Sequence, residues 1–106
     1  MILFSLFCPV PPKIAPISFG QDVMDEGSFG QLLCTVMTGD PPFTFSWSLQ
    51  GAKVSAEAGL TTSQFGQRAS SLMIERVGHR HSGTYRCKVT NSAGSVSATT
   101  ELKVNG

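Results

Sequence analysis

Apolar and polar positions alternate in short runs along most of the chain, and turn residues separate these runs. Such alternation is typical of half-buried strands, and it is clearest at 43–49, where aromatic or aliphatic residues alternate with Thr or Ser. Further strands are predicted at 14–19 and 21–24 (one edge strand broken by Pro16 and Gly20), 31–37, 53–55, 60–65, 67–75, 84–90 and 95–104. Roughly seven to nine short strands with frequent turns predict a β-sandwich or a β-barrel.

Length and composition indicate a single packed domain and argue against nucleic-acid binding and a membrane-spanning helix. The chain has 106 residues, enough for a single domain, and its 41% hydrophobic content supports a packed core. The net charge of +1 gives no electrostatic reason to expect a nucleic acid as partner. No apolar stretch approaches the ~20 residues that a membrane-spanning helix needs.

The first eight residues differ from the rest because nearly all of them are apolar, and Pro9 follows them. They resemble the apolar core of a secretory signal without its basic leader. The alternatives are a genuine N-terminal strand and an apolar extension foreign to the domain. We interpret 1–8 as an apolar leader or signal-peptide remnant and 9–106 as the domain.

The chain contains three cysteines, at positions 8, 34 and 87. An odd number leaves one cysteine unpaired, removed by processing, or bonded between chains. Cys34 and Cys87 lie far apart in the sequence, unlike the CxxC motifs of metal and redox sites.

Cys34, Trp47 and the run Tyr85-Arg86-Cys87 together resemble the signature of an immunoglobulin domain. One short strand after Trp47 and the hairpin signal at 91–94 are similar to the I-set. The resemblance implies an all-β immunoglobulin-like sandwich, with two antiparallel sheets joined by a Cys34–Cys87 disulfide. It also implies that Trp47 packs over this disulfide, that the Tyr85 hydroxyl bonds to the backbone, and that the compartment is oxidising.

Three segments, 11–20, 71–77 and 81–87, resemble the variable Ig domains of arthropod Down syndrome cell adhesion molecules (Dscam). An apolar leader followed directly by a domain is similar to the first domain of the shortened Dscam proteins. Most I-set domains have an Asp where this chain has His81, which removes the acidic partner of the usual salt bridge. A histidine at this position is similar to those Dscam domains.

The Dscam resemblance implies homophilic recognition between cells, in which alternatively spliced sequences set which isoforms match, in a neuronal or an immune role. The expected partners are a second copy, as an antiparallel two-fold homodimer, and further Ig domains of the same chain. The expected location is the extracellular part of a plasma-membrane protein.

Strand parity predicts where a second copy binds. If Cys34 faces the core, its neighbours on the same strand face outward, and if Leu72 and Ile74 face the core, Ser71 and Met73 do not. These two strands are neighbours in an immunoglobulin sheet. The predicted homophilic interface on the outer face of the A-B-E-D sheet comprises Leu33, Thr35, Met37, Ser71 and Met73.

The predicted interface is apolar and contains no charge, which favours contact with an identical surface. Phe65, near the adjacent strand, either extends this surface or is buried in the core. The alternative is that these are scattered exposed apolar residues, which are normal in monomers.

Other candidate chemistry is weaker. Several basic residues could form a cluster that binds a sulfated glycan, although a solvated loop is the favoured interpretation: Arg76, His79, Arg80, His81, Arg86 and Lys88. His79 and His81 lack a third metal ligand at a usable spacing. Ser82, His81 and Asp40 match no catalytic motif. We therefore expect no enzyme activity, no catalytic residue, no cofactor and no metal.

Three functional classes follow from the sequence. The favoured one is homophilic adhesion through the sheet face, and the second is a heterophilic receptor or immune-recognition module. The third is an intracellular I-set spacer of the muscle type, with both cysteines reduced.

Overall fold

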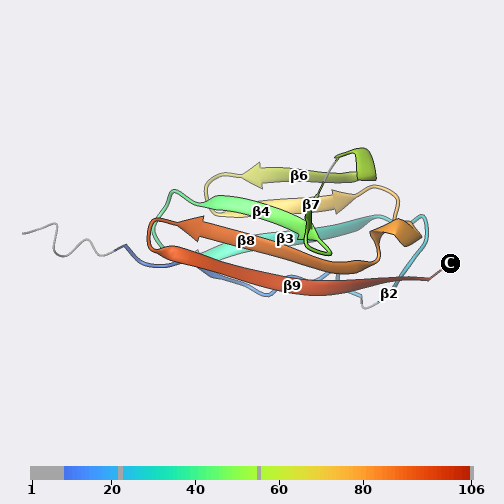
Figure 1. The fold of residues 1–106 in the computed structure, drawn as a ribbon, viewed down its shortest axis with the longest axis horizontal. Coiled ribbons are helices and arrows are strands. Elements are labelled where there is room, and N and C mark those ends of the chain that lie inside the picture. Colours follow the sequence, from blue (N-terminus) through green and yellow to red (C-terminus); the bar gives the residue numbers. More distant parts are fainter. Residues whose placement is uncertain (1–8, 22, 55, 106) are drawn as a thin grey trace, which may run out of the picture.

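The computed structural model describes residues 9–21, 23–54 and 56–105, and the predicted leader at 1–8, with Cys8, lies outside them (Figure 1). The strands are β1 (Lys13–Ile14), β2 (Val23–Asp25), β3 (Gly30–Thr38), β4 (Thr44–Leu49), β5 (Ala52–Lys53), β6 (Leu60–Phe65), β7 (Ala69–Ile74), β8 (Gly83–Asn91) and β9 (Gly94–Asn105). Two short 3-10 helices, η2 (Ala56–Ala58) and η3 (His79–His81), precede β6 and β8. No helix in the described part of the chain is long and apolar enough to cross a membrane.

The strands form two sheets packed face to face, in the orders β1-β3-β7-β6 and β2-β9-β8-β4-β5 (Figure 1). All neighbours are antiparallel except β2 and β9, which run parallel. The predicted immunoglobulin-like sandwich is thus confirmed. The predicted edge strand at 14–24 is divided between the sheets, because β1 pairs with β3 and β2 pairs with β9. Pro16 and Gly20, with a φ of 87°, lie between the two halves.

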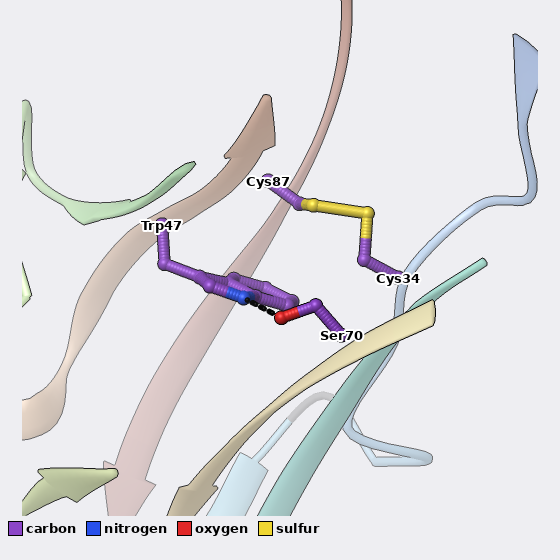
Figure 2. Close-up of a disulfide and its surroundings, with 4 residues drawn as sticks. All are labelled: Cys34, Trp47, Ser70 and Cys87. Atoms are coloured by element: carbon purple, nitrogen blue, oxygen red, sulfur yellow. Dashed lines mark hydrogen bonds between the residues drawn. A yellow bond between two sulfur atoms is a disulfide. The ribbon is translucent and has the colours of Figure 1, made fainter. Parts of the chain in front are cut away.

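The core is built around the Cys34–Cys87 disulfide, which joins β3 of one sheet to β8 of the other. Trp47 is the cross-strand partner of Cys87, and its indole lies beside the disulfide (Figure 2). The indole Nε1–H donates a hydrogen bond to the Ser70 hydroxyl on β7, at 2.9 Å. The two sheets are therefore joined at the centre by one covalent bond and one hydrogen bond. Leu72 is completely buried in the same core.

Tyr85 is completely buried, and its hydroxyl donates a 2.5 Å hydrogen bond to the carbonyl oxygen of His81. The Tyr85 and Phe19 rings pack edge to face, with their centroids 5.2 Å apart. Burial raises the pKa of Tyr85 to about 12, because the phenolate would lose its hydration. The backbone bond implied by the resemblance is present, and it ties β8 to η3.

His81 is buried at the end of the sandwich where η3 lies. The backbone N–H of Gly78 donates to its Nδ1 at 2.9 Å, and its Nε2 lies 2.7 Å from the carbonyl oxygen of Ala58. A ring that accepts at Nδ1 carries its proton on Nε2, so Nε2 donates to Ala58. The His81 ring thus connects the backbone at Gly78 to the backbone at Ala58.

Candidate recognition surface

The outer face of the β1-β3-β7-β6 sheet is organised in rows by the register of three neighbouring strands. Leu32 and Cys34 are fully buried, so the alternate residues of β3 point outward. From β3 through β7 to β6, the outward rows are Gln31–Met73–Thr61, Leu33–Ser71–Ser63 and Thr35–Ala69–Phe65. We call this set of nine residues, together with Met37, the apolar face. The register of β6 on β7 adds Thr61 and Ser63, which parity on β3 and β7 alone did not reveal.

Three large apolar side chains of this face are open to solvent. Leu33 is 49% exposed, Met37 is 66% exposed and Phe65 is 53% exposed. Phe65 thus lies on the outer face and not in the core, which resolves the two alternatives left by the sequence. Thr35 and Met73 are partly exposed.

Met37 lies at an irregularity of the sheet. Lys13 and Ile14 are consecutive in β1, yet they pair with Thr38 and Val36 of β3. Met37 is therefore the extra residue of a β-bulge at the edge of the apolar face. This side chain is also more exposed than those of Leu33 and Phe65.

Ser71 departs from the prediction. It faces the outer side, as parity requires, but it is completely buried. Its side chain is short and lies in the middle strand between Leu33 and Ser63. The Ser71 hydroxyl also has no hydrogen-bond partner within the described residues. Ser71 therefore forms the floor of the apolar face and is not open to a partner.

No ionisable side chain occurs in the three rows of the apolar face. Charged residues adjoin these strands in sequence or register: Lys13 pairs with Thr38 at the sheet edge, and Arg68 and Glu75 flank β7. The Arg68 guanidinium lies 5.4 Å from the centre of the Phe43 ring and donates to the carbonyl oxygen of Gly39. These contacts hold Arg68 toward the loop before β4.

The residues of the weaker basic-cluster alternative belong to a loop and to a strand. Arg76, His79 and Arg80 lie between β7 and β8, whereas Arg86 and Lys88 lie on β8. Both ring nitrogens of the sixth member, His81, already bond to the backbone, so this ring is not placed to bind a metal or accept a proton from a nucleophile. Within the described residues, no group of three side chains is placed to hold a metal ion.

Comparison with known proteins identifies the family. A model described as Immunoglobulin I-set domain matches residues 15–104. Cell adhesion molecule Dscam1 of Drosophila melanogaster is 39% identical over 97 residues, covering 91% of this chain and 5% of that protein. Cell adhesion molecule DSCAML1 of Homo sapiens is 36% identical over 98 residues, covering 90% of this chain and 4% of that protein. The chain therefore spans about a twentieth of the length of these relatives.

The same relationship appears among solved structures. The crystal structure of the Dscam1 Ig7 domain, isoform 5, matches with a TM-score of 0.86 and 40% identity, covering 90% of this chain and 97% of that one. The chain is therefore a member of the immunoglobulin I-set family, similar to the Ig domains of the Dscam cell adhesion molecules.

Proposed function

We propose that this domain is a cell-adhesion module that binds a second copy of itself through the apolar face. The observation that carries the proposal is the exposure of Leu33, Met37 and Phe65 on a sheet face whose three rows contain no charge. Monomeric soluble proteins rarely expose contiguous apolar patches larger than a few hundred Å² unless these patches bind a partner. The relatives named as cell adhesion molecules support this choice of function.

Chemistry of the face favours an identical partner over an unrelated one. In a two-fold contact each residue near the axis meets its own copy, so a charge there would face a like charge. The apolar face has none, and its methionines can adapt their side chains to a facing surface. A two-fold axis within the interface, perpendicular to the strands, packs the two faces together with antiparallel strands. This orientation suits chains that come from opposing cells.

Polar residues interspersed among the apolar ones provide a basis for isoform specificity. Gln31, Thr61 and Ser63 lie in the same rows as the apolar residues. A replacement that leaves one of these polar groups buried without a partner would weaken binding between unlike copies. Affinity of a single pair is expected to be modest, and many pairs between two membranes would add by avidity.

The similarity to Dscam proteins also suggests where this domain is located. We infer that residues 9–106 form one Ig domain among several in the extracellular part of a plasma-membrane protein, and that 1–8 precede this domain. The Cys34–Cys87 disulfide supports an oxidising compartment. Free thiols at both positions in the native protein would favour the intracellular spacer instead.

A concentration series by analytical ultracentrifugation tests the proposed dimer. Leu33→Asp places a carboxylate in the middle row of the apolar face, where burial against a partner is strongly unfavourable. Val23→Asp on β2 is the matched control, because Val23 is 46% exposed and lies on the other sheet. We expect the wild type and Val23→Asp to dimerise, and Leu33→Asp to remain a monomer. Met73→Asp, in the neighbouring row, is expected to behave like Leu33→Asp.

Two results would contradict the proposal. A dimer that persists in both Leu33→Asp and Met73→Asp would place the interface elsewhere. A wild type that stays monomeric at every concentration would favour the heterophilic receptor.

A further inference from the structure

Apart from Val23 on the edge strand β2, the outer face of the second sheet is polar, and its central strands carry basic residues. Trp47 and Cys87 are partners that point inward, so the residues that flank them on β4 and β8 point outward. From β5 through β4 and β8 to β9, one outward row is Lys53–Ser48–Arg86–Thr99, and the next row is Ser46–Lys88–Ser97. We call these seven residues the basic face. It contains three cations and four hydroxyls, with no apolar side chain.

Charge is distributed unevenly over the molecule. On β4, β5, β8 and β9, four of the chain's eight Lys and Arg residues point outward (Lys53, Arg86, Lys88 and Lys103), against the single acidic residue Glu101. The other acidic residue of this sheet, Asp25, lies on the edge strand β2 and bonds to Asn105. The near-neutral total charge of the chain therefore conceals one markedly positive face.

The cations at the centre of this face are available to an external anion. Within the described residues, Arg86 and Lys88 form no ion pair and no side-chain hydrogen bond. Both residues are exposed, and their cross-strand neighbours are the short side chains Ser48 and Thr99, and Ser46 and Ser97.

A shallow hollow of about 350 Å³ adjoins the basic face, lined by Ser48, Gln50, Gly51, Thr84 and Arg86. The Gln50 side-chain oxygen accepts the backbone N–H of Thr84 at 2.6 Å, which leaves the Gln50 amide group free to donate. Guanidinium, amide and hydroxyl donors thus surround one space. This set of donors suits an anionic group with several acceptor oxygens, such as a sulfate.

We propose that the basic face binds a linear sulfated polysaccharide, which lies across β8 with its anionic groups at Arg86, Lys88 and Lys53. Residues two apart on a strand are separated by about 7 Å, and residues two strands apart by about 10 Å. A single small anion would require all three long side chains to converge on one point, whereas a polymer with regularly spaced sulfates can meet the cations where the strands place them. A protein partner fits less well, because protein interfaces are centred on apolar and aromatic side chains.

The two proposed surfaces are on opposite sides of the sandwich (Figure 1). The polysaccharide site is therefore independent of the proposed self-association. A domain that lies on a cell-surface polysaccharide through one face would leave the apolar face open to a second copy.

Binding to heparin measures this property directly. The test variant is Lys53→Gln, Arg86→Gln, Lys88→Gln, and the control variant is Lys13→Gln, Arg76→Gln, Arg80→Gln. Both lower the net charge by three, but the control changes exposed cations outside the basic face. Titration calorimetry in 50 mM and 200 mM salt gives the affinity, and urea unfolding confirms that each variant is folded.

We expect the wild type and the control to bind heparin alike, and the test variant to bind at least tenfold more weakly. Three contacts to a dense polyanion predict that wild-type affinity falls about 20- to 40-fold between the two salt concentrations. Unsulfated heparosan is expected to bind much more weakly than heparin. Leu33→Asp is expected to bind heparin normally, which separates this site from self-association.

Three outcomes would overturn the inference. The first is a wild type that does not bind heparin in 50 mM salt. The second is an equal loss of affinity in the two triple variants, since only total charge would then matter. The third is equal binding of heparosan and heparin, since sulfate would then not be recognised.

Discussion

Two adjacent serines on β7 allow a sharp test of how buried hydroxyls affect stability in this domain. Ser70 is 4% exposed and accepts the Trp47 indole hydrogen bond in the core, as Figure 2 shows. Ser71 is 0% exposed, faces the opposite side, and has no partner for its hydroxyl within the described residues. Replacement by Ala deletes the same atom at both positions, but it breaks a hydrogen bond only at Ser70.

The two substitutions are expected to change the free energy of unfolding in different ways. Ser70→Ala leaves the indole N–H buried without an acceptor, which costs about 1–3 kcal/mol. Ser71→Ala removes a hydroxyl that is buried without compensation, so the expected change lies between zero and a gain of about 1 kcal/mol.

Equilibrium unfolding in urea, followed by circular dichroism, measures both values. For a urea slope of about 2 kcal/mol per molar, a loss of 2 kcal/mol lowers the midpoint by about 1 M. Trp47 is the only tryptophan, so its fluorescence reports the same transition from inside the core. Equal losses in the two variants would refute the reasoning, and so would an unchanged midpoint in Ser70→Ala.

Two further predictions concern the disulfide and the buried tyrosine. The Cys34–Cys87 disulfide joins residues 53 positions apart, so its reduction is expected to lower the free energy of unfolding by about 4 kcal/mol. An unchanged urea midpoint in the reduced protein would contradict this. Burial raises the pKa of Tyr85 from 10.0 to about 12, so its contribution to stability is complete below pH 10 and is lost as the pH rises toward 12, by about 3 kcal/mol in total. Urea midpoints between pH 9 and 12 should fall less steeply in Tyr85→Phe than in the wild type, and parallel curves would argue against an ionisation at Tyr85.

The sandwich could be predicted from local pattern because each strand has one face in the core. Alternation around Cys34 and Leu72 correctly assigned Leu33 and Met37 to the outside. Similar reasoning could not place Phe65, because its strand, β6, is at the sheet edge, where several inward positions are also exposed. Only the pairing of Phe65 with Ala69 put it on the apolar face.

Burial of Ser71 shows a different limit of sequence reasoning. Parity gives the direction of a side chain, but exposure also depends on the length of the side chains around it. A serine in a middle strand beside Leu33 is covered even though it points outward. Similarly, Arg76 and Arg86 are close in sequence, yet one lies in the loop before β8 and the other on β8 itself, which sequence proximity alone did not distinguish.

The parallel pairing of β2 with β9 has a mechanical consequence. The chain enters the sandwich at one end and β9 ends at the other (Figure 1). Near the entry Val10 bonds to Asp40 and Asn91, and at the end of β9 Asn105 bonds to Glu26. Tension applied through the two ends of the domain would load the β2–β9 hydrogen bonds in shear, so they resist together and do not open one at a time. Once they rupture, the disulfide still holds the residues between Cys34 and Cys87, so only the segments outside this loop can extend. If an adhesive contact pulled on this domain, the domain would therefore extend by only a limited length of chain.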